Sequence, residues 1–352
     1  MKRALRLAAA ATVFVLIAAA CSKSTTPSTS GGSSKPGNGQ KIGMVYDLAG
    51  RGDKSFNDSA YIGLTKASHD FNIQVKDLTP SASGQGRQAL MRLLATDGYP
   101  LIFGNGFAFD ADIAAVAKDY PNIKFAETDG GVADLTSSSN LVMNDFAANE
   151  GSFLVGAAAA LTSKSGKVGF IGGVDVGLIH SFQAGFEAGA KQVNPSIQVD
   201  VKYLTAPPNF TGFSDPAKGK EAALGMFGSG DDVIFHAAGG SGAGLFDAAK
   251  EYSTTNSVKV WAIGVDSDQY LTAPAEDQPY ILTSMIKRVD VSVYDTIKDF
   301  IDGKFMGGYR TFGLKSGAID YATSGGFVDS IKSQLDDLKQ KIISGAITVP
   351  TS

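Results

Sequence analysis

The 352-residue sequence has a single cysteine, three histidines and one tryptophan. One cysteine excludes a disulfide framework, a multi-cysteine zinc site and an iron–sulfur cluster, and three scattered histidines do not favour a histidine zinc site. With a net charge of −4, the sequence lacks the excess of basic residues that broad nucleic-acid binding requires. With 43% hydrophobic and 19% charged residues the composition is that of a globular protein, and the length suggests about two domains.

The N-terminus has the pattern of an export signal. Basic residues precede an apolar run over 7–20, which is shorter than the roughly 20 apolar residues that cross a membrane. The run ends at Cys21, and residues 16–21 resemble a bacterial lipobox, in which the cysteine is lipidated and becomes the first mature residue. We predict a signal peptide over 1–20 with lipidation at Cys21. The alternative is an ordinary secretory peptide in which the cysteine is incidental.

Residues 21–40 are nearly all Ser, Thr, Gly and Pro. Such a composition cannot bury a core, and it predicts a flexible tether between the anchor and the folded body.

From Lys41 onward, short apolar runs alternate with longer helical patterns, which indicates βαβ units and a doubly wound α/β fold. The expected strands are 42–46, 73–78, 101–104, 124–126, 141–143, 167–171, 198–204, 233–237, 258–263 and 281–285. The expected helices are 55–70, 86–96, 110–119, 150–162, 181–193, 215–225, 244–252 and 325–343.

These strands are more than one compact sheet usually holds, so we expect two lobes. The first covers 41–146 and is completed by about 284–305. The second covers 147–283 and is completed by about 306–352. Ligands of such folds bind at the carboxyl ends of the strands, and two facing lobes form a cleft that closes by hinge motion.

Polar and aromatic residues follow the first expected strand. Asp47 ends it, and a glycine-rich loop leads to Phe56 and Asn57 at a helix start. Phe56 offers a ring face to a planar ligand, and Asn57 can donate and accept hydrogen bonds at once. The alternative is structural, with Phe56 as a hydrophobic staple and Asn57 or Ser55 as a helix cap. Asp129, which ends the fourth expected strand, is also placed for ligand binding.

Candidates in the second lobe also lie at strand ends. The Asp266 carboxylate can accept two hydrogen bonds from vicinal hydroxyls of a sugar. Lys287 either pairs with Asp266, donates to a ligand or forms a surface salt bridge of little energetic value. The glycines around Gly240 bring backbone close to a ligand or form only a tight turn. Their spacing is not the G-x-G-x-x-G of a dinucleotide site.

Catalytic motifs are absent from the sequence: there is no H-E-x-x-H, no P-loop, no G-x-S-x-G and no cysteine besides Cys21. His236 lies within an expected strand, where a packed histidine is favoured over a general base. We therefore expect a binding protein rather than an enzyme, with no metal and no cofactor.

Six strings in register resemble the basic-membrane-protein family of lipoproteins, of the purine nucleoside receptor type. They are KSFN at 54–57, NEGSFLVG at 149–156, GGVD at 172–175 with FQAGFEAG at 182–189, DPAKGK at 215–220, AGGSG at 238–242, and GVDSDQ at 264–269 with SMIKR at 284–288. The resemblance covers the body from Lys41 to about Val289. It implies a fold like that of type I periplasmic binding proteins, with the ligand between two lobes.

The resemblance also implies a function, which is nucleoside capture for an ATP-driven importer. The expected partners are a nucleoside, the permease and ATPase of an ABC transporter, and the membrane through the lipid anchor, with no nucleic acid. We expect a monomer on the extracytoplasmic face of the cell membrane. A receptor of the same fold for a sugar or another small solute is the alternative, because this architecture serves many ligands.

Site residues carried over from the resemblance begin with Asp47, Phe56 and Asn57, which match the first-lobe ligand loop. Phe56 would stack on the base, and Asp129 would bind the base or the ribose edge.

In the second lobe, Gly240 would bring backbone amides near the ligand, and Asp266 and Lys287 match the pair that holds the ribose hydroxyls. The second stacking aromatic stays open among four residues: Phe182, Phe235, Phe210 and Phe213.

Overall fold

The computed structural model describes residues 37–47, 50–81 and 85–352. The predicted signal peptide, lipidation at Cys21 and tether residues 21–36 lie outside these ranges. Residues 37–40, predicted as the end of the tether, already belong to the fold, because the Gly39 amide donates to the Asn72 carbonyl at 2.8 Å.

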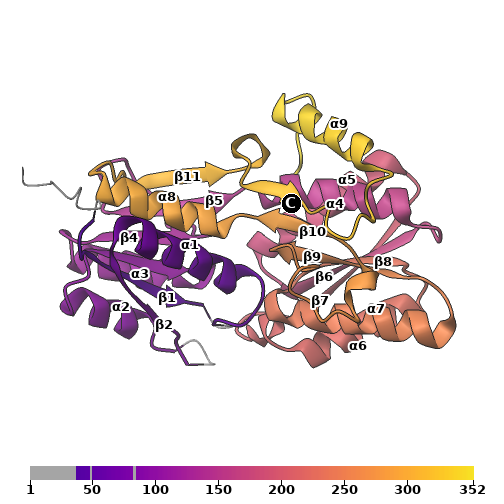
Figure 1. Ribbon diagram of the computed structural model, residues 1–352, viewed down its shortest axis with the longest axis horizontal. Helices are drawn as coiled ribbons and strands as arrows, with labels where there is room; N and C mark the ends of the chain where they lie inside the picture. Colours follow the sequence, from indigo (N-terminus) through magenta and orange to yellow (C-terminus); the bar gives the residue numbers. More distant parts are fainter. Residues whose placement is uncertain (1–36, 48–49, 82–84) are drawn as a thin grey trace, which may run out of the picture. The chain divides into compact units, whose positions relative to one another are not determined.

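The first sheet of the described chain has six strands in the order β11-β5-β4-β3-β1-β2, with every neighbouring pair parallel (Figure 1). Its strands are β1 (Lys41–Tyr46), β2 (Gln74–Leu78), β3 (Leu101–Asn105), β4 (Lys124–Thr128), β5 (Leu141–Phe146) and β11 (Gly308–Phe312). Its helices are α1 (Phe56–Phe71), α2 (Arg87–Thr96), α3 (Asp110–Asp119) and α8 (Val289–Ile301), with the 3₁₀ turn η1 (Phe107–Phe109).

The second sheet of the described chain also has six strands, in the order β12-β10-β9-β8-β6-β7, and only β12 runs antiparallel to its neighbour. Its strands are β6 (Lys167–Val174), β7 (Gln198–Thr205), β8 (Val233–Ala237), β9 (Trp261–Asp266), β10 (Ile281–Lys287) and β12 (Ile319–Tyr321). Its helices are α4 (Ala148–Thr162), α5 (Gly177–Val193), α6 (Pro216–Gly228), α7 (Gly242–Asn256) and α9 (Lys332–Ile343). Its 3₁₀ turns are η2 (Thr211–Phe213), η3 (Gly239–Ser241), η4 (Gln278–Tyr280) and η5 (Leu314–Ser316).

Each sheet is covered on both faces, which explains its continuous apolar strands. Met44 and Val45 on β1 are both fully buried, but Met44 packs with α1 and α8 whereas Val45 packs with α2 and α3. Successive strand residues point to opposite faces, so both must be apolar in a two-sided sheet. We call these two α/β units the first lobe and the second lobe.

Glycines explain why α4 and α5 approach so closely. A Cβ on Gly185 would lie 2.2 Å from the Asn149 carbonyl oxygen, and one on Gly189 would lie 1.9 Å from that of Phe153. Larger side chains would push the helices apart. Two of the strings that carry the family resemblance therefore encode helix packing.

The expected lobe boundaries need correction at the C-terminal side. Strand β10 pairs in the second sheet as far as Lys287, so the chain returns to the first lobe after 287 and not near 284. Strand β11 then pairs with β5 in the first sheet, so the second lobe resumes after Phe312 rather than at 306. Among the described residues the chain thus passes between lobes three times, at β5–α4, β10–α8 and β11–β12.

Three elements were missing from the sequence-based expectations: α8, β11 and β12. The expected helix over 325–343 was partly wrong, because α9 begins only at Lys332. Gly325 and Gly326 have φ values of +83° and +74°, which a helix cannot accommodate.

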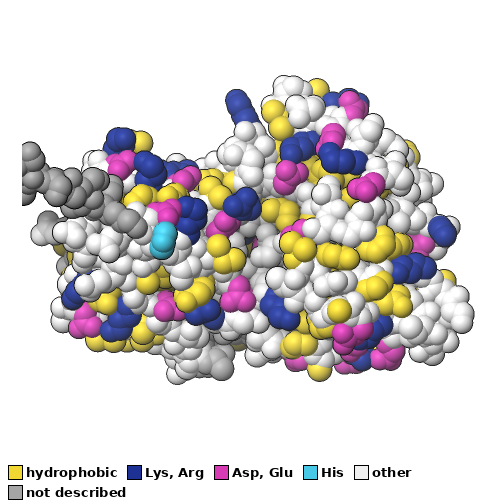
Figure 2. All heavy atoms as spheres, in the orientation of Figure 1, with side chains coloured by type: hydrophobic (Ala, Val, Ile, Leu, Met, Phe, Trp, Pro, Cys, Tyr) yellow, Lys and Arg dark blue, Asp and Glu magenta, His cyan; other side chains and the backbone are white. Residues whose placement is uncertain are grey.

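The surface carries mixed charge, and on the face drawn in Figure 2 basic and acidic side chains are interspersed. Several charges pair along helices, as in Lys66 with Asp70 and Lys298 with Asp302, and such exposed pairs contribute little to stability. Within the described residues, no helix combines the length and the apolar character that a membrane crossing needs.

Candidate ligand site between the lobes

A cavity lies between the lobes at the carboxyl ends of the parallel strands. Residues after β1, β3 and β4 and at the start of α1 line it from the first lobe. Residues at the carboxyl ends of β8, β9 and β10, together with α5 and η2, line it from the second. The lining residues are Asp47, Asp53, Phe56, Asn57, Gly106, Phe107, Asp129, Leu178, Ile179, Phe182, Phe213, Ala237, Gly239, Val265, Asp266 and Lys287.

Three buried charged residues form the ionic part of the cavity. Lys287 at the end of β10 is 1% exposed, and its ammonium contacts the Asp129 carboxylate across the cleft. Asp266 ends β9 and accepts a hydrogen bond from the Ser55 hydroxyl at 2.5 Å. Asp129 and Asp266 have φ values of +62° and +64°, a left-handed conformation that aspartate tolerates better than most residues.

Burial shapes the acid–base behaviour of these carboxyls. Burial raises the pKa of Asp266 to about 6, although Lys287 and the Ser55 hydroxyl oppose the shift. Burial also raises the pKa of Asp129, against the attraction of the Lys287 ammonium. Asp129 Oδ1 is buried and has no hydrogen-bond partner within the described ranges. A buried acceptor of this kind is costly unless a donor reaches it, so a ligand with hydroxyl or amino groups would stabilise the site.

Aromatic rings adjoin the ionic part. The Lys287 ammonium lies 5.0 Å from the Phe56 ring centre and 5.6 Å from that of Phe182. Phe107 of the first lobe faces Phe213 of the second, with 6.2 Å between ring centres. The cavity can therefore offer flat apolar faces and charged hydrogen-bonding groups to the same small molecule.

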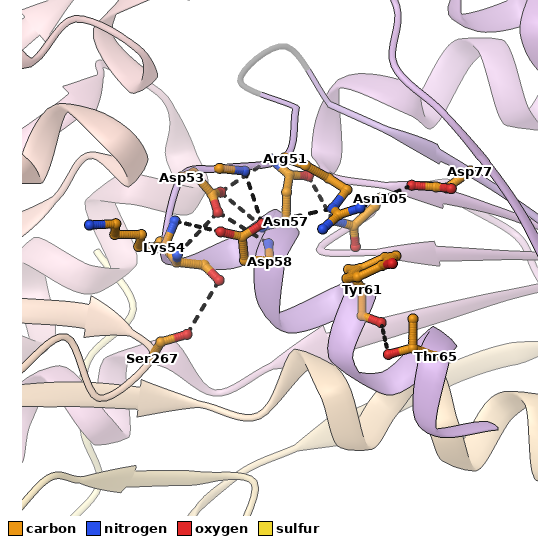
Figure 3. Close-up of polar contacts among 12 residues, drawn as sticks. Arg51, Asp53, Lys54, Asn57, Asp58, Tyr61, Thr65, Asp77, Asn105 and Ser267 are labelled. Carbon is orange, nitrogen blue, oxygen red and sulfur yellow. Dashed lines mark hydrogen bonds and ion pairs between the residues drawn. The ribbon is translucent and has the colours of Figure 1, made fainter. Parts of the chain in front are cut away.

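The loop before α1 is organised by its own carboxylates (Figure 3). Asp53 Oδ1 accepts from the amides of Ser55 and Asp58 at 3.0 and 3.1 Å, which caps the helix start. Asp53 Oδ2 accepts from both the backbone and the side-chain nitrogen of Asn57, at 2.9 and 3.2 Å. The Asn57 side chain also donates to Asp47 at 3.3 Å and accepts from Asn105 at 3.0 Å. Asn57 thus lines the cavity and holds its wall in place.

Polar contacts join this loop to the second lobe. Besides the Ser55–Asp266 bond, the Ser267 hydroxyl donates to the Ser55 carbonyl at 3.3 Å. Figure 3 shows Ser267 reaching toward the loop before α1 from the opposite lobe. The Lys54 ammonium donates to the Thr272 carbonyl at 3.0 Å. The two sides of the cavity are therefore in direct contact.

Of the residues expected at the site, Asp47, Phe56, Asn57, Asp129, Phe182, Asp266 and Lys287 line the cavity. Phe235 does not, which corrects that expectation.

Phe235 is fully buried inside β8, with its ring centre 5.6 Å from that of Phe170 and 5.4 Å from that of Phe186. The expectation for Gly240 is also corrected. Gly240 lines a neighbouring cavity, and the adjacent Gly239 lines the candidate site. Phe213, left as an option from the sequence, lines the cavity, whereas Phe210 does not.

The sequence reasoning missed Asp53 and Phe107. Asp53 lies shortly before an expected helix, where aspartate side chains commonly accept hydrogen bonds from the first helical amides. This pattern could have indicated Asp53 from the sequence. Phe107 follows an apolar run and Gly106, and only its neighbours in the fold distinguish it from a core phenylalanine.

The family model of ABC transporter substrate-binding proteins, PnrA-like (Bmp), matches residues 40–352. The chain belongs to this family. This confirms the family predicted from the six strings and places the chain among substrate-binding proteins of ABC transporters.

Two relatives and one solved structure agree with the Bmp assignment. The chain is 36% identical to the ABC transporter nucleoside-binding protein BmpA of Lactococcus lactis, over 99% of each chain. It is 32% identical to basic membrane protein A of Borreliella burgdorferi, over 89% of this chain and 88% of that one. An ABC transporter solute-binding protein of Aeropyrum pernix matches with a TM-score of 0.77 and 28% identity, covering 89% of this chain and 94% of that one. The type I binding-protein fold is thereby confirmed.

Proposed function

We propose that this Bmp-family chain captures a nucleoside, of the purine class, in the cavity between its lobes and delivers it to the permease and ATPase of an ABC importer. The lobes open and close around the ligand by a hinge at the three crossings. The nucleoside-binding name of the Lactococcus lactis relative supports the ligand class.

The observation that carries the proposal is the contact between the aromatic and ionic parts of one cavity. A nucleoside has a flat base joined directly to a polyhydroxylated ribose, and the cavity has the same two characters side by side. Phe56 would stack on the base, which contributes about 1–3 kcal/mol per base. Asp266 and Lys287 would bind the ribose hydroxyls, and Asp129 Oδ1 would accept from the base or the ribose.

Isothermal titration calorimetry with adenosine, guanosine, inosine, uridine and ribose tests this assignment. We expect heat from the purine nucleosides, weaker heat from uridine and none from ribose. Binding of a sugar without binding of any nucleoside would contradict the proposal and favour the sugar receptor. Mass spectrometry of the small molecule that co-purifies with the protein provides an independent answer.

We also propose that the chain is held at the extracytoplasmic face of the membrane through a lipid on Cys21. Cells fed a labelled fatty acid should label the wild-type protein and not Cys21→Ser. Equal labelling of the two proteins, or none in the wild type, would reject the anchor.

A further inference from the structure

Gln269, in the loop after β9, is 3% exposed and contacts both lobes without lining the candidate ligand cavity. Its Oε1 accepts from the Val265 amide at 2.8 Å and from His236 Nε2 at 3.0 Å. The backbone amide of Gln269 donates to the Ser284 hydroxyl at 3.1 Å. These bonds attach Gln269 to β8, β9 and β10 of the second lobe.

The remaining group of the side chain, Nε2, donates to the Lys54 carbonyl of the first lobe at 3.3 Å. The orientation of the side-chain amide is determined by its partners. The Val265 amide can only donate, so oxygen must face it, and the Lys54 carbonyl can only accept, so nitrogen must face that. The bond between the lobes therefore has a defined direction.

His236 fixes the side-chain oxygen of Gln269 through a hydrogen bond from its Nε2. It is fully buried, and burial lowers its pKa to about 4, so the ring is neutral near pH 7. Because Gln269 Oε1 is an acceptor, the ring proton must be on Nε2. A Cβ on Gly242 would lie 1.9 Å from the ring, so the start of α7 leaves the imidazole no room to move away.

Lys54 is the residue through which this contact reaches the site. It has a φ of +51°, a left-handed conformation that few residues adopt without support. The next two residues are Ser55, which donates to Asp266, and Phe56, which lines the cavity. A hydrogen bond on the Lys54 carbonyl therefore fixes the peptide unit that sets the positions of both.

We propose that Gln269 is a positioning residue for ligand capture: when the lobes close, its side-chain amide fixes the Lys54–Phe56 segment and slows ligand release without touching the ligand. This rests on the proposed nucleoside binding. The bond joins the lobes, so it forms only in the closed protein. Its loss should accelerate dissociation far more than it slows association.

The variant Gln269→Glu tests the proposal, because glutamate keeps the acceptor for Val265 and His236 but presents an oxygen to the Lys54 carbonyl. Gln278→Glu is the matched control, since Gln278 Nε2 also donates to a carbonyl at 3.3 Å, but to Ala273 within its own lobe. Stopped-flow kinetics and calorimetry with adenosine give the rates and the affinity, and thermal unfolding of the unliganded protein gives the stability.

We expect Gln269→Glu to release adenosine about tenfold faster, which is the scale of one lost hydrogen bond plus repulsion. The association rate should stay within about twofold, the unliganded protein should unfold cooperatively at a lower melting temperature because a buried carboxyl replaces a neutral amide, and the control should match the wild type throughout. Unchanged dissociation, or a loss of melting temperature with unchanged kinetics of the folded protein, would overturn the proposal.

A distance measurement separates this proposal from the nucleoside assignment. Spin labels on Lys118→Cys and Lys202→Cys, both exposed and one in each lobe, report closure in a Cys21→Ser background. Gln269→Glu should shift the population of lobe–lobe distances toward longer values, with and without adenosine. If the wild type binds no nucleoside, the proposed function fails, while the shift in the unliganded protein still decides the role of Gln269.

Discussion

A buried aspartate stands at the carboxyl end of the third strand of each sheet, and the two aspartates differ in the group that contacts them from the opposite lobe. Asp129 directly follows β4 and is contacted by an ammonium from the second lobe, that of Lys287. Asp266 ends β9 and accepts a hydrogen bond from a first-lobe hydroxyl, that of Ser55. Equivalent positions in two similar lobes thus carry the same side chain and the same left-handed backbone, but different electrostatics.

This difference indicates that the two aspartates have different roles, with Asp129 stabilising lobe closure and Asp266 binding the ligand. The charge pair at Asp129 ties the lobes together, because neither ion is well solvated when the cleft is closed. Burial raises the pKa of both carboxyls, but the Asp266 carboxylate is contacted by a neutral hydroxyl where Asp129 has an ammonium, so a ligand that donates hydrogen bonds has more to gain at Asp266.

Asp129→Asn should have the largest effect. It removes the carboxylate that pairs directly with the buried Lys287 ammonium, and breaking such a pair typically costs about 3–5 kcal/mol. We expect adenosine affinity, measured by calorimetry, to fall about 100-fold or more. Asp302→Asn, which breaks the exposed pair with Lys298, is the control and should stay within about twofold. Equal behaviour of the two variants would remove the special role of the buried pair.

Asp266→Asn should weaken adenosine binding about tenfold or more, because the ligand loses a charged acceptor. The Ser55 hydroxyl can still donate to the amide oxygen, so the melting temperature of the unliganded protein should not fall, and near pH 7 it should rise because no carboxylate has to be buried. An unchanged affinity would exclude Asp266 from the site. A large loss of stability would contradict the different roles of the two aspartates.

The pH dependence should separate the two aspartates as well. With a pKa of about 6, roughly nine-tenths of Asp266 is protonated at pH 5, so wild-type affinity should fall about tenfold between pH 7.5 and 5. Stability should change in the opposite sense. The unfolded carboxyl has a pKa near 3.9, so this group makes the unliganded protein less stable as pH rises from about 4 to 6. Asp266→Asn should remove the pH dependence of affinity and reduce that of stability, whose remainder comes from other buried carboxyls with raised pKa values, such as Asp129 and Asp231. An unchanged pH dependence of affinity would assign it to another group.

Asp53→Asn should have the smallest effect. The amide nitrogen replaces one of the two oxygens that accept from the start of α1, so part of the cap is lost. A cap contributes about 0.5–2 kcal/mol, and we expect a loss of this size in unfolding free energy with about fivefold weaker adenosine binding. An effect on binding as large as that of Asp129→Asn would mean that Asp53 itself contacts the ligand.

Local sequence predicted the strands that are buried on both faces. Strand β8 matches the expected 233–237, because its apolar residues and the glycines after it define both ends. Strand β11 was missed because Tyr309 is exposed and Arg310 is half-buried, so the segment has no apolar run. Its place in the sheet depends on β5, which lies far back in the chain.

Phe235 shows the corresponding limit for the site. It precedes a glycine-rich turn, as cavity residues often do, but on a strand only every second residue faces a given side. Here β8 directs Phe235 into an aromatic cluster with Phe170 and Phe186. The local sequence around Gln269 indicates no role for it, because its partner Lys54 lies 215 residues away in the chain.

The sequence by itself determined the family, the alternation of strands and helices, and the aspartates that end β4 and β9. Those features follow from local hydrophobic pattern and from motifs read along the chain. Only the tertiary structure decided that Asp129 receives Lys287 while Asp266 receives Ser55. Those partners come from opposite lobes, and burial in a shared cleft gives their charges and hydrogen bonds their strength.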